Sequence, residues 1–443
     1  MTNDSNNINA QFYRYLWAYI LVALSGCLGN VVDGIIVGNL ISADGVSAIN
    51  QSKPIIQFIF TLHLLINAGG GMLVGYALGQ NDRLRAHELF TRALALSAVI
   101  GVLLALLGGW LMLDATAAVL CDNAHLLPLA RDYMRVVMLG APAYILMWGL
   151  STMVGVDGSP RLVSLAVIVD NVVNLCLDIV FIHWLDWGIT GSSTATVVGH
   201  LVGIAILLTH WRGGKAKLAL RWALSGWWTS MRSIVGQGAP LALASVCLTA
   251  LLFAANTIVL SITGRTGIFV FAVCMNLLQV YNLFLSGTCQ TLQSLGAIQV
   301  GKGDGQGLRV VLDKALRFIT VSMVVTCVVV WVVPQAIARL FGASDAQVIA
   351  ECNHALRVFA LSFIPFCYIY VLMIVYKLYG QHRMALLISI MLSLTVIPVL
   401  WIVARMAPQW IWYSYLAAYI IEGVVIWVAH RLNGVEFQLK PKV

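Results

Sequence analysis

Four acidic residues of this chain lie inside long apolar stretches, where an ionised carboxylate has no water to stabilise its charge. They are Asp33, Asp170, Asp178 and Glu422. An ionisable group within a membrane span is costly, so it indicates a functional site unless it only joins neighbouring helices by hydrogen bonds. Oxygen ligands suit a proton or a hard cation such as Na⁺, and not zinc or copper. The first hypothesis is therefore a cation-binding site inside a membrane.

Polar side chains accompany these acids at helical spacing. Asp170, Asn174 and Asp178 recur every four residues, which places them on one face of a helix. Asn171 lies at the margin of that face. The same spacing rule links Asn30 with Asp33, and Thr196 with His200.

Helix packing is the alternative for each residue taken singly. A buried Asn or Thr often joins two helices, and His200 alone is more typical of packing or of a pore lining. Glu422 has no obvious partner and remains an accessory candidate. Two carboxylates among several polar positions on three apolar stretches favour a site over packing alone.

The composition places the chain in a lipid bilayer. Apolar residues make up 60% and charged residues 10%, whereas soluble proteins have about half and a quarter. The net charge of +8 is scattered over short loops, which does not predict binding to nucleic acid. The expected partners are the bilayer and small molecules, and the expected state is a monomer.

Twelve apolar stretches are long enough to cross a bilayer, which takes about twenty residues. They are residues 13–40, 54–78, 91–113, 130–155, 161–184, 188–211, 233–261, 267–299, 314–334, 355–379, 383–404 and 410–431. This predicts an all-α, multi-pass membrane protein. We expect an N-terminal lobe over 1–211, a basic cytoplasmic linker over 212–232 and a C-terminal lobe over 233–443.

The two halves repeat each other. Gly79-Gln-Asn-Asp82 returns 222 residues later as Gly301-Lys-Gly-Asp304, and other short matches keep the same offset. Internal repeats of this kind are typical of secondary transporters. Six spans per half return the chain to its starting side, so the halves are expected to be parallel repeats.

The distribution of basic residues predicts the orientation. With both termini in the cytoplasm, only seven of the 26 Lys and Arg residues lie outside. Cytoplasmic loops are generally the basic ones, which favours this arrangement in the cytoplasmic membrane. The seven outer residues are Lys53, Arg131, Arg135, Arg265, Arg339, Arg357 and Arg405.

Several segments resemble the multidrug and toxic compound extrusion (MATE) family of cation-coupled efflux transporters. The segments are Val32-Asp-Gly-Ile-Ile-Val-Gly38, Gly155-Val-Asp-Gly-Ser-Pro160, Asn174-Leu-Cys-Leu-Asp178, Trp187-Gly-Ile-Thr-Gly191 with Ala195-Thr196, and Gly238-Ala-Pro240. The resemblance covers almost the whole chain.

The resemblance implies a V-shaped bundle of two six-helix lobes that exports drugs as Na⁺ or H⁺ enters. It places the coupling site on Asp33, Asn174, Asp178 and Thr196, with no cofactor and no metal ion other than Na⁺ at that site. The accessory candidates are Asn30, Asp170, Asn171, His200 and Glu422. Two departures stand out, because spans 7 and 10 lack the acids that some relatives carry and span 1 lacks their proline.

The expected substrates are amphipathic, cationic molecules in a cavity lined by aromatic, Met and amide groups. The cavity candidates are Asn276, Gln279, Asn282, Tyr368 and Met373. A flippase for lipid-linked oligosaccharides is the runner-up, although the extra spans and intramembrane basic residues that it needs are absent. An intramembrane transferase would need a second Asp cluster, which the second half lacks.

Overall fold

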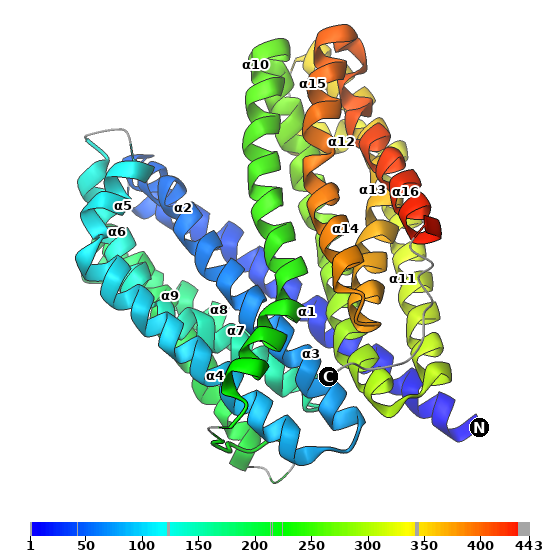
Figure 1. Ribbon diagram of the computed structural model, residues 1–443. Helices are drawn as coiled ribbons and strands as arrows, with labels where there is room; N and C mark the ends of the chain where they lie inside the picture. Colours follow the sequence, from blue (N-terminus) through cyan, green and yellow to red (C-terminus); the bar gives the residue numbers. More distant parts are fainter. Residues whose placement is uncertain are drawn as a thin grey trace. The chain divides into compact units, whose positions relative to one another are not determined.

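The computed structural model describes residues 2–41, 43–121, 125–212, 214, 216–223, 225–341 and 345–432. Regular secondary structure in these ranges is entirely helical (Figure 1). The first half contains α1 (Thr2–Leu40), α2 (Ala43–His63), α3 (Gly69–Gly79), α4 (Arg83–Leu106), α5 (Leu113–Leu120), α6 (Leu127–Leu139), α7 (Ala141–Val156), α8 (Pro160–Asp178) and α9 (Gly188–Arg212). The second half contains α10 (Trp227–Lys302), α11 (Gly305–Val332), α12 (Pro334–Leu340), α13 (Ala346–Leu378), α14 (His382–Leu394), α15 (Val396–Met406) and α16 (Ser414–Leu432).

Three π-helical turns and one 3₁₀ turn extend these helices. The π-helical turns are η1 (Leu64–Ala68), η2 (Leu107–Leu111) and η3 (Ile179–Trp184), and the 3₁₀ turn is η4 (Pro408–Tyr413). Turns of the π type are rare and often mark functional sites. η3 begins directly after Asp178, one of the predicted site residues.

The helices confirm the prediction of a multi-pass membrane protein. Within the described ranges, 11 helices are long and apolar enough to span a membrane, and the bent pair α6–α7 brings the number to 12. That pair bends by 48° near Gly140. α10 is also two spans, because Gly264 interrupts it with a φ of 63°, which L residues with a side chain rarely adopt.

The chain folds as two compact units. The N-terminal unit runs from Tyr13 to Ala239, and the C-terminal unit runs from Pro240 onward together with the first residues up to Phe12. In the N-terminal unit α8 and α9 pack along each other (Figure 1), and α7 packs against both. These three helices carry most of the candidate site.

The repeated loops share their backbone conformation as well as their sequence. Asn81 and Gly303, which are equivalent at the repeat offset, both have positive φ, 61° and 70°. The next residue caps a helix in each half: Asp82 accepts the backbone N–H of Arg85 at 3.0 Å, and Asp304 accepts that of Gly307 at 2.8 Å. The duplicated sequence therefore encodes the same local structure twice.

The segment between the halves is bound to the N-terminal unit through its backbone. Arg92, which is 5% exposed, donates to the carbonyls of Ser225 at 2.7 Å and Ala223 at 3.2 Å, and to the hydroxyl of Ser230 at 2.6 Å. Arg221 N–H donates to the hydroxyl of Thr91 at 2.7 Å. These bonds hold the segment against α4.

A buried carboxylate fixes the beginning of the same segment. Asp157 accepts the backbone N–H groups of Lys217 at 2.9 Å and Leu218 at 3.3 Å. Its Oδ2 also lies 2.7 Å from Nε2 of His210. All the bonds of this anchor lie within the N-terminal unit, so residues 216–223 and 225–230 form part of that unit.

Candidate functional site

Asp33 and Asp178 face each other inside the N-terminal unit. Asp33 lies on α1 and is partly buried, whereas Asp178 ends α8 and is 0% exposed. Each carboxyl interacts with the other, and no other group among the described residues donates a hydrogen bond to either oxygen of Asp178. Two neighbouring carboxylates that are both ionised repel each other, but one shared proton or a bound cation relieves the repulsion.

Asn174 and Thr196 form the second pair of the predicted site. Nδ2 of Asn174 donates to Oγ1 of Thr196 at 3.2 Å, between α8 and α9. The hydroxyl of Tyr144, on α7, interacts with Thr196 and lies within electrostatic range of Asp33. Tyr144 thus connects the two pairs, and the four predicted coupling residues are neighbours in one polar region.

Two tyrosines of this region were not among the sequence-predicted residues. Tyr133 on α6 and Tyr144 on α7 are 6% and 3% exposed, and both lie within electrostatic range of Asp33. A buried tyrosine hydroxyl usually has a hydrogen-bonding partner. Both tyrosines lie in the predicted span 130–155, but their spacing does not relate them to Asp33 or Asp178, which lie in other spans.

The accessory candidates in the first half separate into three cases. Asp170 and His200 pair with each other, at 2.9 Å between Oδ2 and Nδ1. Asn171 faces α1 instead, where its Nδ2 donates to Oγ of Ser25 at 3.0 Å. The side chain of Asn30 lies outside the described residues.

Glu422 is the accessory candidate in the C-terminal unit. It lies on α16 and is 0% exposed, and neither of its carboxylate oxygens has a hydrogen-bonding partner among the described residues. The hydroxyl of Tyr419, one turn earlier on the same helix, is within electrostatic range. Burial of an acid without donors is compatible with a neutral, protonated side chain.

The predicted cavity residues differ in exposure. Asn276, Gln279 and Tyr368 are exposed, Asn282 is partly exposed, and Met373 is 0% exposed. Tyr368 shares a hydrogen bond of 2.7 Å with Thr320, whereas the sulfur of Met373 accepts one from Ser389 at 3.2 Å. Met373 therefore packs inside the C-terminal unit, whereas the other four side chains keep exposed surface.

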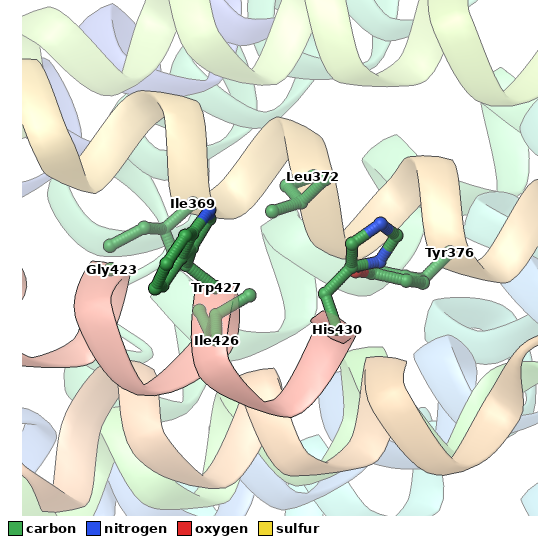
Figure 2. A pocket seen from close by; sticks show the side chains of 7 residues that line it. All are labelled: Ile369, Leu372, Tyr376, Gly423, Ile426, Trp427 and His430. Atoms are coloured by element: carbon green, nitrogen blue, oxygen red, sulfur yellow. The ribbon is translucent and has the colours of Figure 1, made fainter. Parts of the chain in front are cut away.

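A separate apolar pocket lies between α13 and α16 in the C-terminal unit (Figure 2). It encloses about 190 Å³, and none of the predicted cavity residues lines it. Its polar end is the hydrogen bond of 2.8 Å between the Tyr376 hydroxyl and Nδ1 of His430. The lining residues are Ile369, Leu372, Tyr376, Gly423, Ile426, Trp427 and His430.

Sequence comparisons place the chain among transporters. A family model described as MatE matches residues 19–180 and again residues 240–402, close to the offset of the internal repeat. Multidrug export protein MepA of Staphylococcus haemolyticus (strain JCSC1435) is 21% identical over 432 residues, covering 96% of this chain and 95% of that protein. MepA of Staphylococcus aureus (strain MRSA252) is 22% identical over 395 residues, with coverages of 88% and 87%.

Solved structures share the fold. The crystal structure of a mutant of the Vibrio cholerae MATE transporter VcmN has a TM-score of 0.89 at 19% identity and covers 99% of this chain and 100% of its own. The crystal structure of MATE in the bent conformation has a TM-score of 0.87 at 17% identity, with coverages of 96% and 95%. The family model covers most of the chain in two repeats, and its fold is that of the solved MATE transporters. The chain therefore belongs to the MatE family of multidrug efflux transporters.

Proposed function

We propose that this protein is an antiporter that exports amphipathic, cationic small molecules across the cytoplasmic membrane while H⁺ or Na⁺ enters. One observation carries the proposal: Asp33 and Asp178 face each other, and Asp178 has no donor to either oxygen among the described residues. Such a pair has lower energy with a proton or cation than without. Asn174 and Thr196, which are bonded to each other, would supply further oxygen atoms.

The coupling follows from the change of charge. When the pair holds a cation, the region around it is less negative, and helices that pack on it experience a different field. An ion that binds one arrangement of a transporter more tightly than another shifts the population toward that arrangement. Entry of the cation down its gradient would thereby drive release of substrate on the outer side.

The substrate class rests on different support. Relatives over most of the chain are named multidrug export proteins. Asn276, Gln279 and Tyr368 present amide and aromatic groups at exposed positions of α10 and α13. Amides and aromatic rings accommodate molecules that combine an apolar body with a positive charge.

The orientation proposed is that both termini and the segment 212–232 face the cytoplasm, on the basis of the basic residues. In a Cys-free background we expect Gln347→Cys to react with a membrane-impermeant thiol reagent in intact cells, and Lys302→Cys to react only after the cells are opened. Both positions are exposed in the structure. Reaction of Lys302→Cys in intact cells would show that the proposed orientation is wrong.

Gradient-driven transport tests the function. Proteoliposomes containing the purified protein and a cationic dye are exposed separately to a pH gradient and to a Na⁺ gradient at fixed membrane potential. We expect dye movement against its own gradient under at least one of the two, and none in liposomes without protein. If neither ion gradient moves dye, the antiport proposal is wrong.

A further inference from the structure

Among its described residues, the N-terminal unit contains two buried His–Asp pairs with very different surroundings. In the first, Asp157 meets His210 and also accepts two backbone N–H groups from Lys217 and Leu218. Its carboxylate is therefore satisfied by the segment that it anchors. This pair has the geometry of a structural anchor.

The second pair, Asp170 and His200, lacks such additional bonds. Nδ1 of His200 lies 2.9 Å from Oδ2 and 3.1 Å from Oδ1 of Asp170, and the two residues are 9% and 6% exposed. Nε2 of His200 is buried and has no hydrogen-bonding partner among the described residues. The imidazole therefore keeps one nitrogen that can still accept a proton.

The helices approach closely at this pair because of a glycine. A Cβ atom at Gly199 would lie 2.6 Å from Oδ1 and 2.9 Å from the backbone oxygen of Asp170. Any side chain there would push α8 from α9 or displace the carboxylate. The packing of the two helices thus leaves space for Asp170 at this point.

The pair is one helical turn from the proposed coupling site. Asp170 precedes Asn174 by four residues on α8, and His200 follows Thr196 by four residues on α9. Asp170 is therefore displaced toward the Pro160 end of α8, and His200 toward the Arg212 end of α9. Tyr144 spans the interval, since its hydroxyl interacts with Thr196 and its ring meets the His200 ring edge-on at 4.5 Å.

The other titratable groups near the pair come from four helices. Tyr144 on α7 is the nearest and interacts with Asp170 as well. The ring of His63 on α2 lies 5.5 Å from the Trp148 ring, and the Trp148 ring lies 6.1 Å from the ring of His200. Asp33 on α1 and Tyr133 on α6 act on Tyr144 from the coupling site.

We propose that Asp170 and His200 form a second proton-binding site, which receives the proton that the Asp33–Asp178 pair releases toward the cytoplasm. The O–H bond of the carboxyl breaks and an N–H bond forms at Nε2 of His200, by way of hydroxyl groups or water between them. The Asp170 carboxylate at 2.9 Å balances the resulting imidazolium charge. Histidine is the side chain best suited to such a transfer near neutral pH. The inference rests on the proposed antiport with H⁺ as the coupling ion.

The test compares His200→Gln with His210→Gln in proteoliposomes. Glutamine can still donate to the neighbouring aspartate in each case, but it cannot carry a proton. For His200→Gln we expect efflux driven by a pH gradient to fall at least about tenfold and to lose its dependence on cytoplasmic-side pH. Binding of the dye should be unchanged, and His210→Gln should keep the wild-type pH profile.

The outcomes distinguish failure of the second proton-binding site from failure of the proposed antiport. A His200→Gln variant with wild-type rate and pH profile overturns the second site, and so does a wild-type protein driven by Na⁺ alone. A wild-type protein driven by neither ion refutes the proposed function instead. If His200→Gln does not fold, proton release on dye binding is measured in detergent for Asp170→Asn, which removes the carboxylate that balances the imidazolium charge. It should be smaller than in the wild type, and equal release refutes the second site.

Discussion

Replacement of Asp33 by asparagine is expected to abolish gradient-driven efflux while the protein still inserts and folds. The amide is neutral and of the same size, so it resembles the carboxyl with its proton permanently in place. The repulsion with Asp178 that distinguishes the loaded from the empty pair then disappears, and with it the link between cation and substrate. We expect the dye efflux rate in proteoliposomes to fall to that of protein-free liposomes.

Neighbouring substitutions should follow a graded order. Asp178→Asn is expected to be nearly as severe, because it removes the other charge of the pair. Thr196→Ala should be milder, since it deletes one oxygen, which accepts from Asn174, and no charge. Asp44→Asn is the control, because that acid on α2 has a side chain that is 57% exposed. If Asp33→Asn pumps dye at the wild-type rate at matched expression, the coupling residues have been wrongly assigned and Glu422 becomes the next candidate.

Asp157→Ala should have the largest effect on stability. The carboxylate is 0% exposed and bonds two backbone N–H groups and His210, all of which would lose their acceptor. Each buried donor that loses its acceptor costs about 1–3 kcal/mol. We expect a clear fall in the melting temperature of the purified protein in detergent, together with faster proteolysis between residues 212 and 232.

The control for this variant is Asp132→Ala, which removes an exposed acid of α6 in the same unit. It should melt within a degree or so of the wild type, because surface substitutions change the free energy of unfolding by less than about 0.5 kcal/mol. Equal melting temperatures for Asp157→Ala and Asp132→Ala would show that the anchor does not stabilise the unit.

The sequence alone predicted the helices and part of the site. Apolar length predicted the spans, and the four-residue spacing placed Asp170, Asn174 and Asp178 on one face of α8. The bond between Asn174 and Thr196 depends on the packing of α8 against α9. The meeting of Asp33 with Asp178 could not follow from spacing, because the two residues lie 145 positions apart. The resemblance to the family supplied that expectation.

Tertiary contacts account for what the sequence did not predict. His200 taken alone is typical of packing or of a pore lining, and its bond to Asp170 depends on the close helix approach at Gly199. The segment 212–232 was recognised as a basic linker, but its attachment uses backbone groups, which leave no trace in side-chain patterns. Tyr144 was overlooked for a similar reason, because its role depends on which helices its hydroxyl reaches.

A measurement of ion counterflow tests coupling at the Asp33–Asp178 pair most directly. Substrate is added to one side of proteoliposomes that have no ion gradient, and the movement of H⁺ and of Na⁺ is recorded. The wild-type protein should move one of these ions opposite to the substrate in a fixed ratio, and Asp33→Asn should bind substrate equally well but move no ion. Ion counterflow in Asp33→Asn equal to that of the wild type, or substrate movement in the wild type without any ion, would contradict coupling at the Asp33–Asp178 pair.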